Sequence, residues 1–528
     1  MSLAKYQISN LVNDSERLIA ALTSDRKEFK AILHSIAKAR VIEIRSKQDC
    51  YHWLDKANFL TKNLCNSLAS QISLPILLQA VVNFYYGNNR STYADHPDTF
   101  WIGPALKGTI AYISGNILSS DHIGQRTSLK NLKEIIFSVE FILQLNQIQT
   151  LFEVFEQPGD YVILGENGIK ETSENFADVR RQYWESFIHR GQTHRTLDIC
   201  NKALWQDAVE SMNAVERILA GNSPKQEKIF QGTFFAEIPA ENYSAFWAGI
   251  WIRLLAAAYS SKFQIQLNQD PLGVSIFNAF PFPIDNRIVR NNRYLVIQEE
   301  LKKLIWNAEW YEKRFASNIP NMLVERPVVQ LFPQREVYAT SFLLIGDSIN
   351  WFVESCILNE HNEFNINVPN HLFQNHVSSA FETAIIQLFR SNGFIAGRVT
   401  EQGVWSTESN NIKFYNRFGN RIPGEIDVLA FNREAKLVYI LECKVLNYPF
   451  RTNQMRNLVY KIDDICDTEL FHSKLRKKLS WIKDTNYFES NEEMNFRSFL
   501  VLDRKFPGMG NSTDSNTIEQ SQLNQIIK

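Results

Sequence analysis

The sequence has few cysteines and no pair of the C-x-x-C kind. Its six cysteines are scattered singly among 528 residues. Zinc-binding motifs and disulfide frameworks need cysteines at short, regular spacings, so neither kind of site is indicated. Isolated cysteines at this frequency are typical of a reducing compartment, and we expect a cytoplasmic protein.

Signals for a membrane are also scarce. The N-terminus lacks the charged-then-apolar pattern of a secretion signal. The longest apolar run, Ala245–Tyr259, is too short to span a bilayer and contains Arg253. We therefore expect no membrane association and interpret this run as a buried helix.

Neither sign of charge is in excess. The chain carries 56 Lys and Arg against 57 Asp and Glu, a formal net charge of −1. No global field steers such a protein to nucleic acid, so any basic surface must be local. A hydrophobic content of 45% is typical of a folded soluble protein. The length exceeds that of a single core and predicts two to four domains.

In the first two thirds of the chain the pattern of apolar residues changes part way along. Residues 1–225 have apolar side chains at helical spacing and predict a mostly helical region, with one helix from Ser9 to Arg40. Residues 226–365 predict a mixed α/β region of short strands around a helix near 296–315. A loop is expected at Tyr93–Gly103. Further helices are predicted at 52–69, 74–86, 121–155, 174–190, 196–220 and 240–260.

The most informative stretch runs from Gly424 to Lys444. Two short apolar segments, Ile426–Phe431 and Leu437–Leu441, are separated by a polar break of turn length. This pattern predicts a β-hairpin inside a sheet. Because Leu437–Leu441 is apolar without interruption, we expect it to be a central strand that is buried on both faces.

Both strands carry charge where the core of a sheet has none. Side chains alternate along a strand, so Glu442 and Lys444 project together while Cys443 points the other way. Pairing of the strands can bring Asp427 next to Glu442. Two adjacent carboxylates repel unless a cation lies between them, and Mg²⁺ prefers such oxygens. The pattern predicts a Mg²⁺ site, in which Mn²⁺ should substitute; an ordinary charged pair on an edge strand is the alternative.

An aspartate followed by Glu-x-Lys on the next strand, after a helix that bears a glutamate, resembles the PD-(D/E)XK, or restriction-endonuclease-like, nuclease superfamily. The resemblance covers roughly residues 371–505. It implies that Asp427, Glu442 and the main-chain carbonyl of Cys443 bind the metal, and that Lys444 orients or activates the attacking water. One departure is that Pro423 stands before Gly424-Glu425-Ile426, whereas the family's proline often directly precedes the aspartate.

The glutamate of the preceding helix is Glu382. The helix is expected over about 370–392, and Glu382 shares a face with Ile386 and Phe389. A carboxylate on an apolar face needs a cation or a hydrogen-bond partner. Ser379-x-x-Glu382 also fits a capping box, which is the alternative role. Since the first helix of the family supplies a glutamate to the metal site, the resemblance assigns Glu382 there.

The remaining elements complete the predicted fold. Strands near 394–400, 411–417 and 497–503 and a helix over 451–480 give the α-β-β-β-α-β order of the family core within residues 371–506. The fold class is therefore α+β and multidomain. Residues 507–528 are polar and are expected to form a flexible tail.

The resemblance implies a Mg²⁺-dependent phosphodiester hydrolase that acts on nucleic acid, with DNA the better expectation because most of the superfamily cuts DNA. Arg451, Gln454 and Lys461 are expected to contact phosphates, unless they are ordinary solvated surface. The N-terminal region would serve recognition or regulation, through a partner protein or a second copy. Restriction or anti-phage defence is suggested by analogy alone. The alternatives are a branched-DNA repair or recombination nuclease and a non-catalytic nucleic-acid-binding or scaffold protein.

Overall fold

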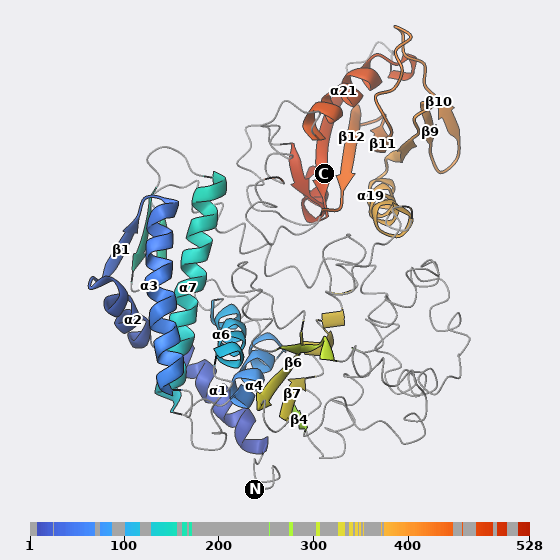
Figure 1. Ribbon diagram of the computed structural model, residues 1–528. Helices are drawn as coiled ribbons and strands as arrows, with labels where there is room; N and C mark the ends of the chain where they lie inside the picture. The colour runs from blue at the N-terminus through green and yellow to red at the C-terminus, as the bar shows by residue number, and fades with distance from the viewer. Residues whose placement is uncertain are drawn as a thin grey trace, which may run out of the picture. The chain divides into compact units, whose positions relative to one another are not determined.

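A computed structural model gives the fold of this chain (Figure 1). The residues that it describes are 8–24, 26–68, 74–86, 101–116, 128–155, 161–165, 168–171, 253, 274–277, 302–306, 326–332, 337–341, 344–346, 348–349, 352, 371, 374–446, 457, 471–488, 494–503 and 516–527. They divide into two compact units, the first from Ile8 to Phe352 and the second from His371 to Ile527. Each unit contains helices and β-sheet, so the fold is of the mixed α/β kind.

The first unit begins with helices. The helices predicted at 52–69, 74–86 and 121–155 are confirmed, with somewhat different ends. The predictions at 174–190 and 196–220 lie outside the described residues, as does that at 240–260 except for Arg253, which is helical and buried. The described helices are α1 (Ile8–Ser24), α2 (Lys27–Ala37), α3 (Lys47–Leu68), α4 (Leu74–Tyr86), α6 (Ile102–Asn116) and α7 (Leu129–Phe155).

Helix α7 is the apolar centre of this group. Leu132, Ile135, Ile136 and Val139 are fully buried. Among the described helices it alone is long and apolar enough to cross a membrane, over Leu129–Glu153, but 83% of the apolar 18-residue window within it is buried inside the protein. Burial of this extent is typical of a core helix.

The single helix predicted from Ser9 to Arg40 is wrong: the segment forms α1 and α2. Near the end of α1 the hydroxyl of Thr23 donates to the carbonyls of Ile19 and Ala20, and that of Ser24 donates to the carbonyl of Ala21. Such side chains compete with the backbone for hydrogen bonds and favour helix ends over helix interiors.

The loop predicted at Tyr93–Gly103 is also wrong at its end, because α6 begins at Ile102. Proline is tolerated in the first turn of a helix, where its missing N–H has no partner to lose, so Pro104 does not prevent this start. Gly108 serves packing rather than a turn. A Cβ atom there would lie 2.9 Å from Cγ1 of Val139, so glycine lets α6 approach α7 this closely without displacing that side chain.

Two small sheets complete the described part of the first unit. One has the order β1-β2-β3 and the other the order β4-β7-β6-β5. The helix predicted near 296–315 is wrong at residues 305–306, which form a strand parallel to β6. The strands are β1 (Val41–Ile44), β2 (Val162–Gly165), β3 (Gly168–Glu171), β4 (Val274–Phe277), β5 (Ile305–Trp306), β6 (Val328–Phe332) and β7 (Val337–Ser341).

The second unit contains a seven-stranded sheet with the order β10-β9-β8-β11-β12-β13-β14. Strand β12 is central, antiparallel to β11 and parallel to β13, and the residues from Val438 to Leu441 are fully buried, as predicted. Its strands are β8 (Ile395–Val399), β9 (Val404–Ser406), β10 (Asn411–Lys413), β11 (Ile426–Asn432), β12 (Leu437–Lys444), β13 (Asn495–Leu502) and β14 (Thr517–Glu519).

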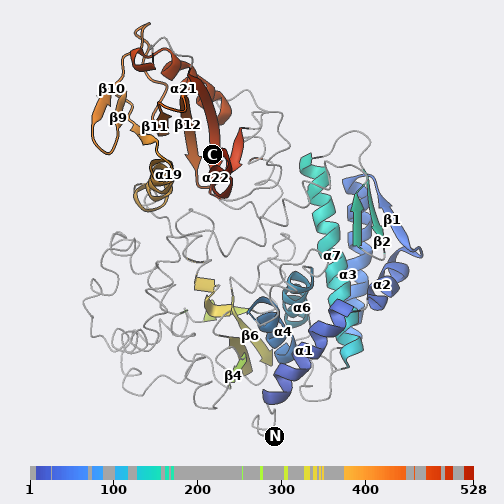
Figure 2. The same cartoon turned by 180° about the vertical axis from the view of Figure 1, so that it is seen from behind.

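Helices cover both faces of this sheet (Figure 1; Figure 2). On one face Tyr439 and Leu441 of β12 pack with helix α19 (Ser379–Ser391), which a π-helical turn, Gln374–Ser378, precedes. On the other face Val438 and Ile440 pack with helix α21 (Phe471–Lys483). The alternation of side chains along β12 thus creates two separate cores.

The flexible tail predicted for residues 507–528 is wrong for residues 516–527. Strand β14 pairs in parallel with β13, and helix α22 (Leu523–Ile526) follows it and lies beside β12 (Figure 2). Leu523 is fully buried in the core that faces α19, and the hydroxyl of Tyr439 donates a 2.9 Å hydrogen bond to the carbonyl of Ile526. A few buried apolar side chains outweigh the polar composition of this segment.

Replacement of Leu523 tests the role of this segment. We expect Leu523→Ala to reduce the unfolding free energy of the second unit by about 2–5 kcal/mol, because it leaves a cavity in the core. Calorimetry should show a lower unfolding temperature, and hydrogen exchange should place the loss in β13 and β14. Asn524→Ala is the matched control, since that side chain is exposed. Equal behaviour of the two variants would show that the segment does not stabilise the sheet.

Candidate active site

The two motif strands place Asp427 opposite Glu442. Val428 of β11 pairs with Leu441 of β12, so the next residues outward along the two antiparallel strands are Asp427 and Glu442. On its other edge β11 shifts register against β8 between Ile426 and Leu429, which is a β-bulge. Bulges change the direction of a side chain. The carboxylate of Asp427 turns to β12, where Oδ2 accepts a 2.7 Å hydrogen bond from the backbone N–H of Cys443.

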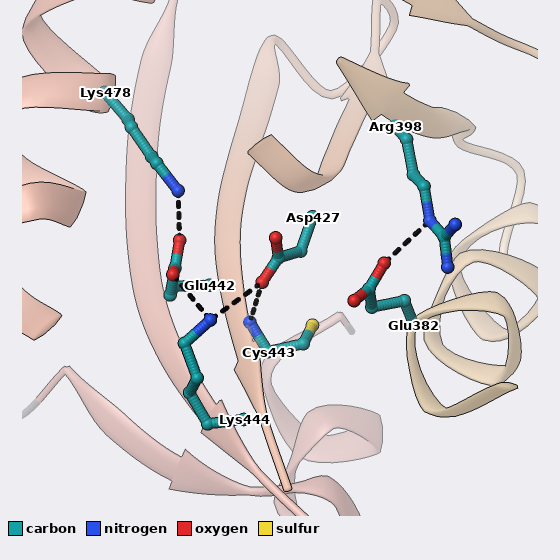
Figure 3. Close-up of polar contacts among 7 residues, drawn as sticks. All are labelled: Glu382, Arg398, Asp427, Glu442, Cys443, Lys444 and Lys478. Atoms are coloured by element: carbon teal, nitrogen blue, oxygen red, sulfur yellow. Dashed lines mark hydrogen bonds and ion pairs between the residues drawn. The ribbon is translucent and has the colours of Figure 1, made fainter. Parts of the chain in front are cut away.

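The carboxylate of Glu442 is buried and holds two ammonium groups, one on each oxygen (Figure 3). Lys444 Nζ lies 2.7 Å from Glu442 Oε1 and 3.6 Å from Asp427 Oδ2. Lys478 Nζ, which comes from α21, pairs with Glu442 Oε2. Lys444 therefore links the two predicted metal ligands, and Lys478 adds a second cation to one of them.

The surroundings shift the pKa values of these groups in opposite directions. Burial and the charge of Glu442 raise the pKa of Asp427 above its ordinary value, although Lys444 and Lys478 oppose the shift. Burial acts to raise the pKa of Glu442 as well, but its two ammonium partners outweigh burial and bring the pKa below the usual range. Burial acts to lower the pKa of Lys444, but the charges of Asp427 and Glu442 raise it above the ordinary value. Lys444 therefore stays an ammonium.

Glu382 approaches the site from the other face of the sheet. It lies in the first turn of α19, and its Oε2 is 2.7 Å from Nε of Arg398 in β8 (Figure 3). No side-chain hydrogen bond caps the start of α19, so the described structure does not support the capping-box alternative. Burial, and after it the charge of Asp427, raise the pKa of Glu382 to about 7. Glu382 therefore interacts electrostatically with the predicted site while it is ion-paired with Arg398.

Cys443 projects to the face of β12 opposite Glu442 and Lys444, as predicted. Its side chain is part of the core that faces α19, and burial raises the pKa of its thiol well above the ordinary value. A thiol in such surroundings is chemically inert. Only the main chain of Cys443 is available to the site.

Two charged residues of the cluster, Lys478 and Arg398, were missed by the sequence analysis. Lys478 belongs to a run of basic residues that is typical of solvated surface, but Leu475, Lys478 and Ile482 form one buried stripe of α21. Its spacing from these apolar neighbours is the signal that could have identified it. Arg398 interrupts an apolar strand, the same signal that singled out Asp427 and Glu442.

The predicted phosphate contacts Arg451, Gln454 and Lys461 lie outside the described residues. Of the helix predicted over 451–480, the described part is Asn457 and the residues from Phe471, where α21 begins.

The cluster is balanced in charge. Three carboxylates, Glu382, Asp427 and Glu442, face three cations, Arg398, Lys444 and Lys478. Among the described residues no three His, Cys, Asp or Glu side chains are grouped closely enough to hold a metal ion. The carboxylate oxygens of Asp427 and Glu442, with the nearby carbonyl of Cys443, are nevertheless hard ligands of the kind that Mg²⁺ takes. A divalent ion fits this donor set where it competes with an ammonium for Glu442.

No protein-family model matches the chain, and neither does any curated protein or solved structure. Its function is therefore inferred from the geometry of its own residues.

Titration of Glu382 should make stability depend on pH. Because the folded-state pKa of about 7 exceeds the ordinary value of 4.5, the native state favours the protonated form. This stabilisation is complete below about pH 4.5 and is lost as the pH rises to about 7. Glu382→Gln mimics the protonated form, so its stability relative to the wild type should increase with pH, by at most about 3 kcal/mol at 1.36 kcal/mol per pKa unit.

Calorimetry of both proteins from acidic to mildly alkaline pH measures this difference. Glu408→Gln is the matched control, because that side chain is exposed and should give no pH-dependent difference. A constant difference between Glu382→Gln and the wild type across the whole range would contradict the assignment.

Removal of Lys478 should lower the free energy of unfolding, because the buried Glu442 then loses one of its two cationic partners. Lys478→Met keeps most of the apolar side chain but deletes one of the two ammonium partners. Breaking a buried ion pair costs about 3–5 kcal/mol, and the remaining Lys444 should keep the loss near the lower figure. The loss should shrink at acidic pH, where Glu442 becomes protonated. Lys477→Met, one residue earlier and exposed, is the control; equal stability of the two variants at neutral pH would refute the ion pair.

Proposed function

We propose that the second unit is a metal-dependent nuclease of the PD-(D/E)XK kind that hydrolyses phosphodiester bonds. The observation that carries the proposal is the position of Lys444 Nζ, 2.7 Å from Glu442 and 3.6 Å from Asp427, on the central pair of strands. An aspartate, a glutamate and a lysine in one place form a combined metal and phosphate site. Their sequence pattern alone is much less specific than this geometry.

The order of elements also supports the proposal. Helix α19 precedes strands β8, β11 and β12, and helix α21 is followed by β13, which is parallel to β12. This is the order that the superfamily core would have. The β9–β10 hairpin after β8 and the edge strand β14 are additions to it.

Each residue of the site has a role in this chemistry. Asp427, Glu442 and the carbonyl of Cys443 would hold Mg²⁺, or Mn²⁺ in its place. When bound, the ion supplies a Lewis acid for the scissile phosphate and lowers the pKa of a water. Lys444 cannot be a metal ligand, because an ammonium only donates; it holds the attacking water and offsets negative charge on the phosphate.

Glu382 has a role that differs from that of a permanent metal ligand. Its pKa of about 7 lets it hold or release a proton near neutral pH, which suits general acid–base catalysis. Arg398 keeps it in place from β8.

The substrate proposed is DNA, and the role proposed for the chain is restriction or anti-phage defence. Both follow from analogy with the superfamily. The first unit would then recognise the target or regulate cleavage, alone or with a partner. A branched-DNA repair or recombination nuclease would have the same site.

One observation favours a second candidate, a non-catalytic nucleic-acid-binding or scaffold protein. The three carboxylates of the cluster already have three cationic partners, and Lys444 and Lys478 occupy both oxygens of Glu442. A site of this kind could serve only to stabilise the sheet. It would then have no use for a divalent ion.

Cleavage assays on the full chain distinguish the two candidates. Supercoiled, linear, single-stranded and branched DNA and RNA are each incubated with Mg²⁺, Mn²⁺ or a chelator. We expect cleavage that needs the metal and is abolished in Asp427→Asn and Glu442→Gln. Lys444→Ala should lose about two orders of magnitude in rate, the cost of deleting one electrostatic donor, while it still binds the metal.

Lys477→Met is the control for cleavage too, because it changes charge nearby on the exposed face of α21. Wild-type cleavage by Asp427→Asn or Glu442→Gln would show that the site is elsewhere. No metal-dependent cleavage of any of these substrates would favour the non-catalytic candidate.

A further inference from the structure

The loop between β10 and β11 is held rigidly although it lies at the surface. Oδ1 of Asn416 accepts hydrogen bonds from the backbone N–H groups of Phe418 (2.9 Å) and Asn420 (3.3 Å), and the carbonyl of Asn416 accepts one from Gly419 (3.0 Å). Gly419 has φ +69°, a conformation that glycine adopts without strain. These bonds give the turn one defined shape.

The same loop is fastened to the end of α21. Nε1–H of Trp481 donates a 2.9 Å hydrogen bond to the carbonyl of Asn420, and the backbone N–H of Arg417 donates one to the carbonyl of Asp484 at the same distance. Asn416 also forms a bridge with Thr485. Both ends of the turn are thus fixed to the last turn of α21, the helix that carries Lys478, and to the two residues that follow it.

This rigid loop presents aromatic side chains to solvent. Phe418 is 71% exposed and Tyr415 is 63% exposed. Tyr487, 38% exposed, packs edge-on against Phe414, directly before Tyr415 in the chain, at a centroid distance of 5.4 Å. Exposed aromatic rings grouped on one loop are a feature that marks interaction sites.

The charge of the loop selects the kind of partner. From Ser409 to Gly424 the sequence contains Lys413, Arg417 and Arg421 and no acidic residue. All three side chains are exposed. Aromatic rings among cations are the combination that single-stranded nucleic acid requires, since the rings stack on unpaired bases and the cations contact phosphates. In a duplex the bases are already stacked on one another.

The loop leads directly to the proposed catalytic site. Gly424, at its end, lies against the side chain of Lys478: a Cβ atom there would be 3.9 Å from Lys478 Cε. Phe418 precedes Asp427 by nine residues. Their Cα atoms are therefore within roughly 32 Å of one another, which about nine nucleotides span at roughly 3.4 Å each.

We propose that the loop Tyr415–Arg421 is a single-strand contact: Phe418 stacks on an unpaired base while Arg417 and Arg421 bind the flanking phosphates. The proposal rests on the proposed nuclease function and specifies its substrate, a nucleic acid with an unpaired segment beside the cleavage site. A frayed end, a gap, a flap or a single strand provides such a segment.

Binding measured without cleavage tests the contact. The full chain, in chelator, is titrated into a labelled single strand of about twelve nucleotides and into the corresponding duplex, and anisotropy is followed. We expect Phe418→Ala to weaken single-strand binding by about fivefold or more, the effect of one lost stack, and to change duplex binding much less. Phe418→Trp should restore binding. Arg417→Gln and Arg421→Gln should each reduce the salt dependence, by about 0.7 in the slope of log K against log salt.

Ile395→Ala is the control, because Ile395 of β8 is 48% exposed and lies outside the loop. The contact is refuted if Phe418→Ala binds the single strand like the wild type, if Phe418→Trp fails to restore binding, or if the wild type binds no single strand. Cleavage is scored separately. If the chain binds the single strand through Phe418 but cleaves no substrate with any metal ion, the proposed nuclease function is refuted and the contact stands. If the chain cleaves with a metal ion but Phe418→Ala binds the single strand like the wild type, only the contact is refuted.

Discussion

The second unit is organised around the burial of one carboxylate, that of Glu442. Removing an ionised carboxylate from water costs several kcal/mol even after relaxation, so it must be compensated within the protein. Lys444, two residues later on the same face of β12, compensates from one side, and Lys478 of α21 compensates from the other. The packing of α21 on β12 is therefore an electrostatic requirement as well as an apolar one.

Helix α21 serves two sites at once. Leu475, Trp481 and Ile482 anchor it in the core, Lys478 points into the acidic cluster, and Trp481 also holds the loop that precedes Asp427. A movement of this helix would change the ion pairing of Glu442 and the position of the aromatic loop together. The proposed substrate contact at the loop and the proposed ion site at Glu442 would therefore be coupled through this one helix.

The features that the sequence predicted correctly depend on residues that are close together in the chain. The hairpin, the burial of β12 and the meeting of Asp427 with Glu442 follow from a two-residue period and one turn. The missed features depend on contacts distant in sequence. Lys478 becomes part of the site because α21 packs on β12, and residues 516–527 form β14 and α22 because they pair with β13 and bury Leu523. Arg398 becomes part of the site because α19 packs beside β8 and places Glu382 against it.

Calorimetric titration of Mn²⁺ into the nucleic-acid-free chain tests most directly whether the Glu442 cluster is a metal site or a closed ion-pair network. We expect the wild type to bind Mn²⁺, Glu442→Gln to lose this binding, and Lys478→Met to bind more tightly because the ion no longer competes with that ammonium. Equal binding by the wild type and Glu442→Gln, or no binding by Lys478→Met, would show that the cluster is a closed ion-pair network.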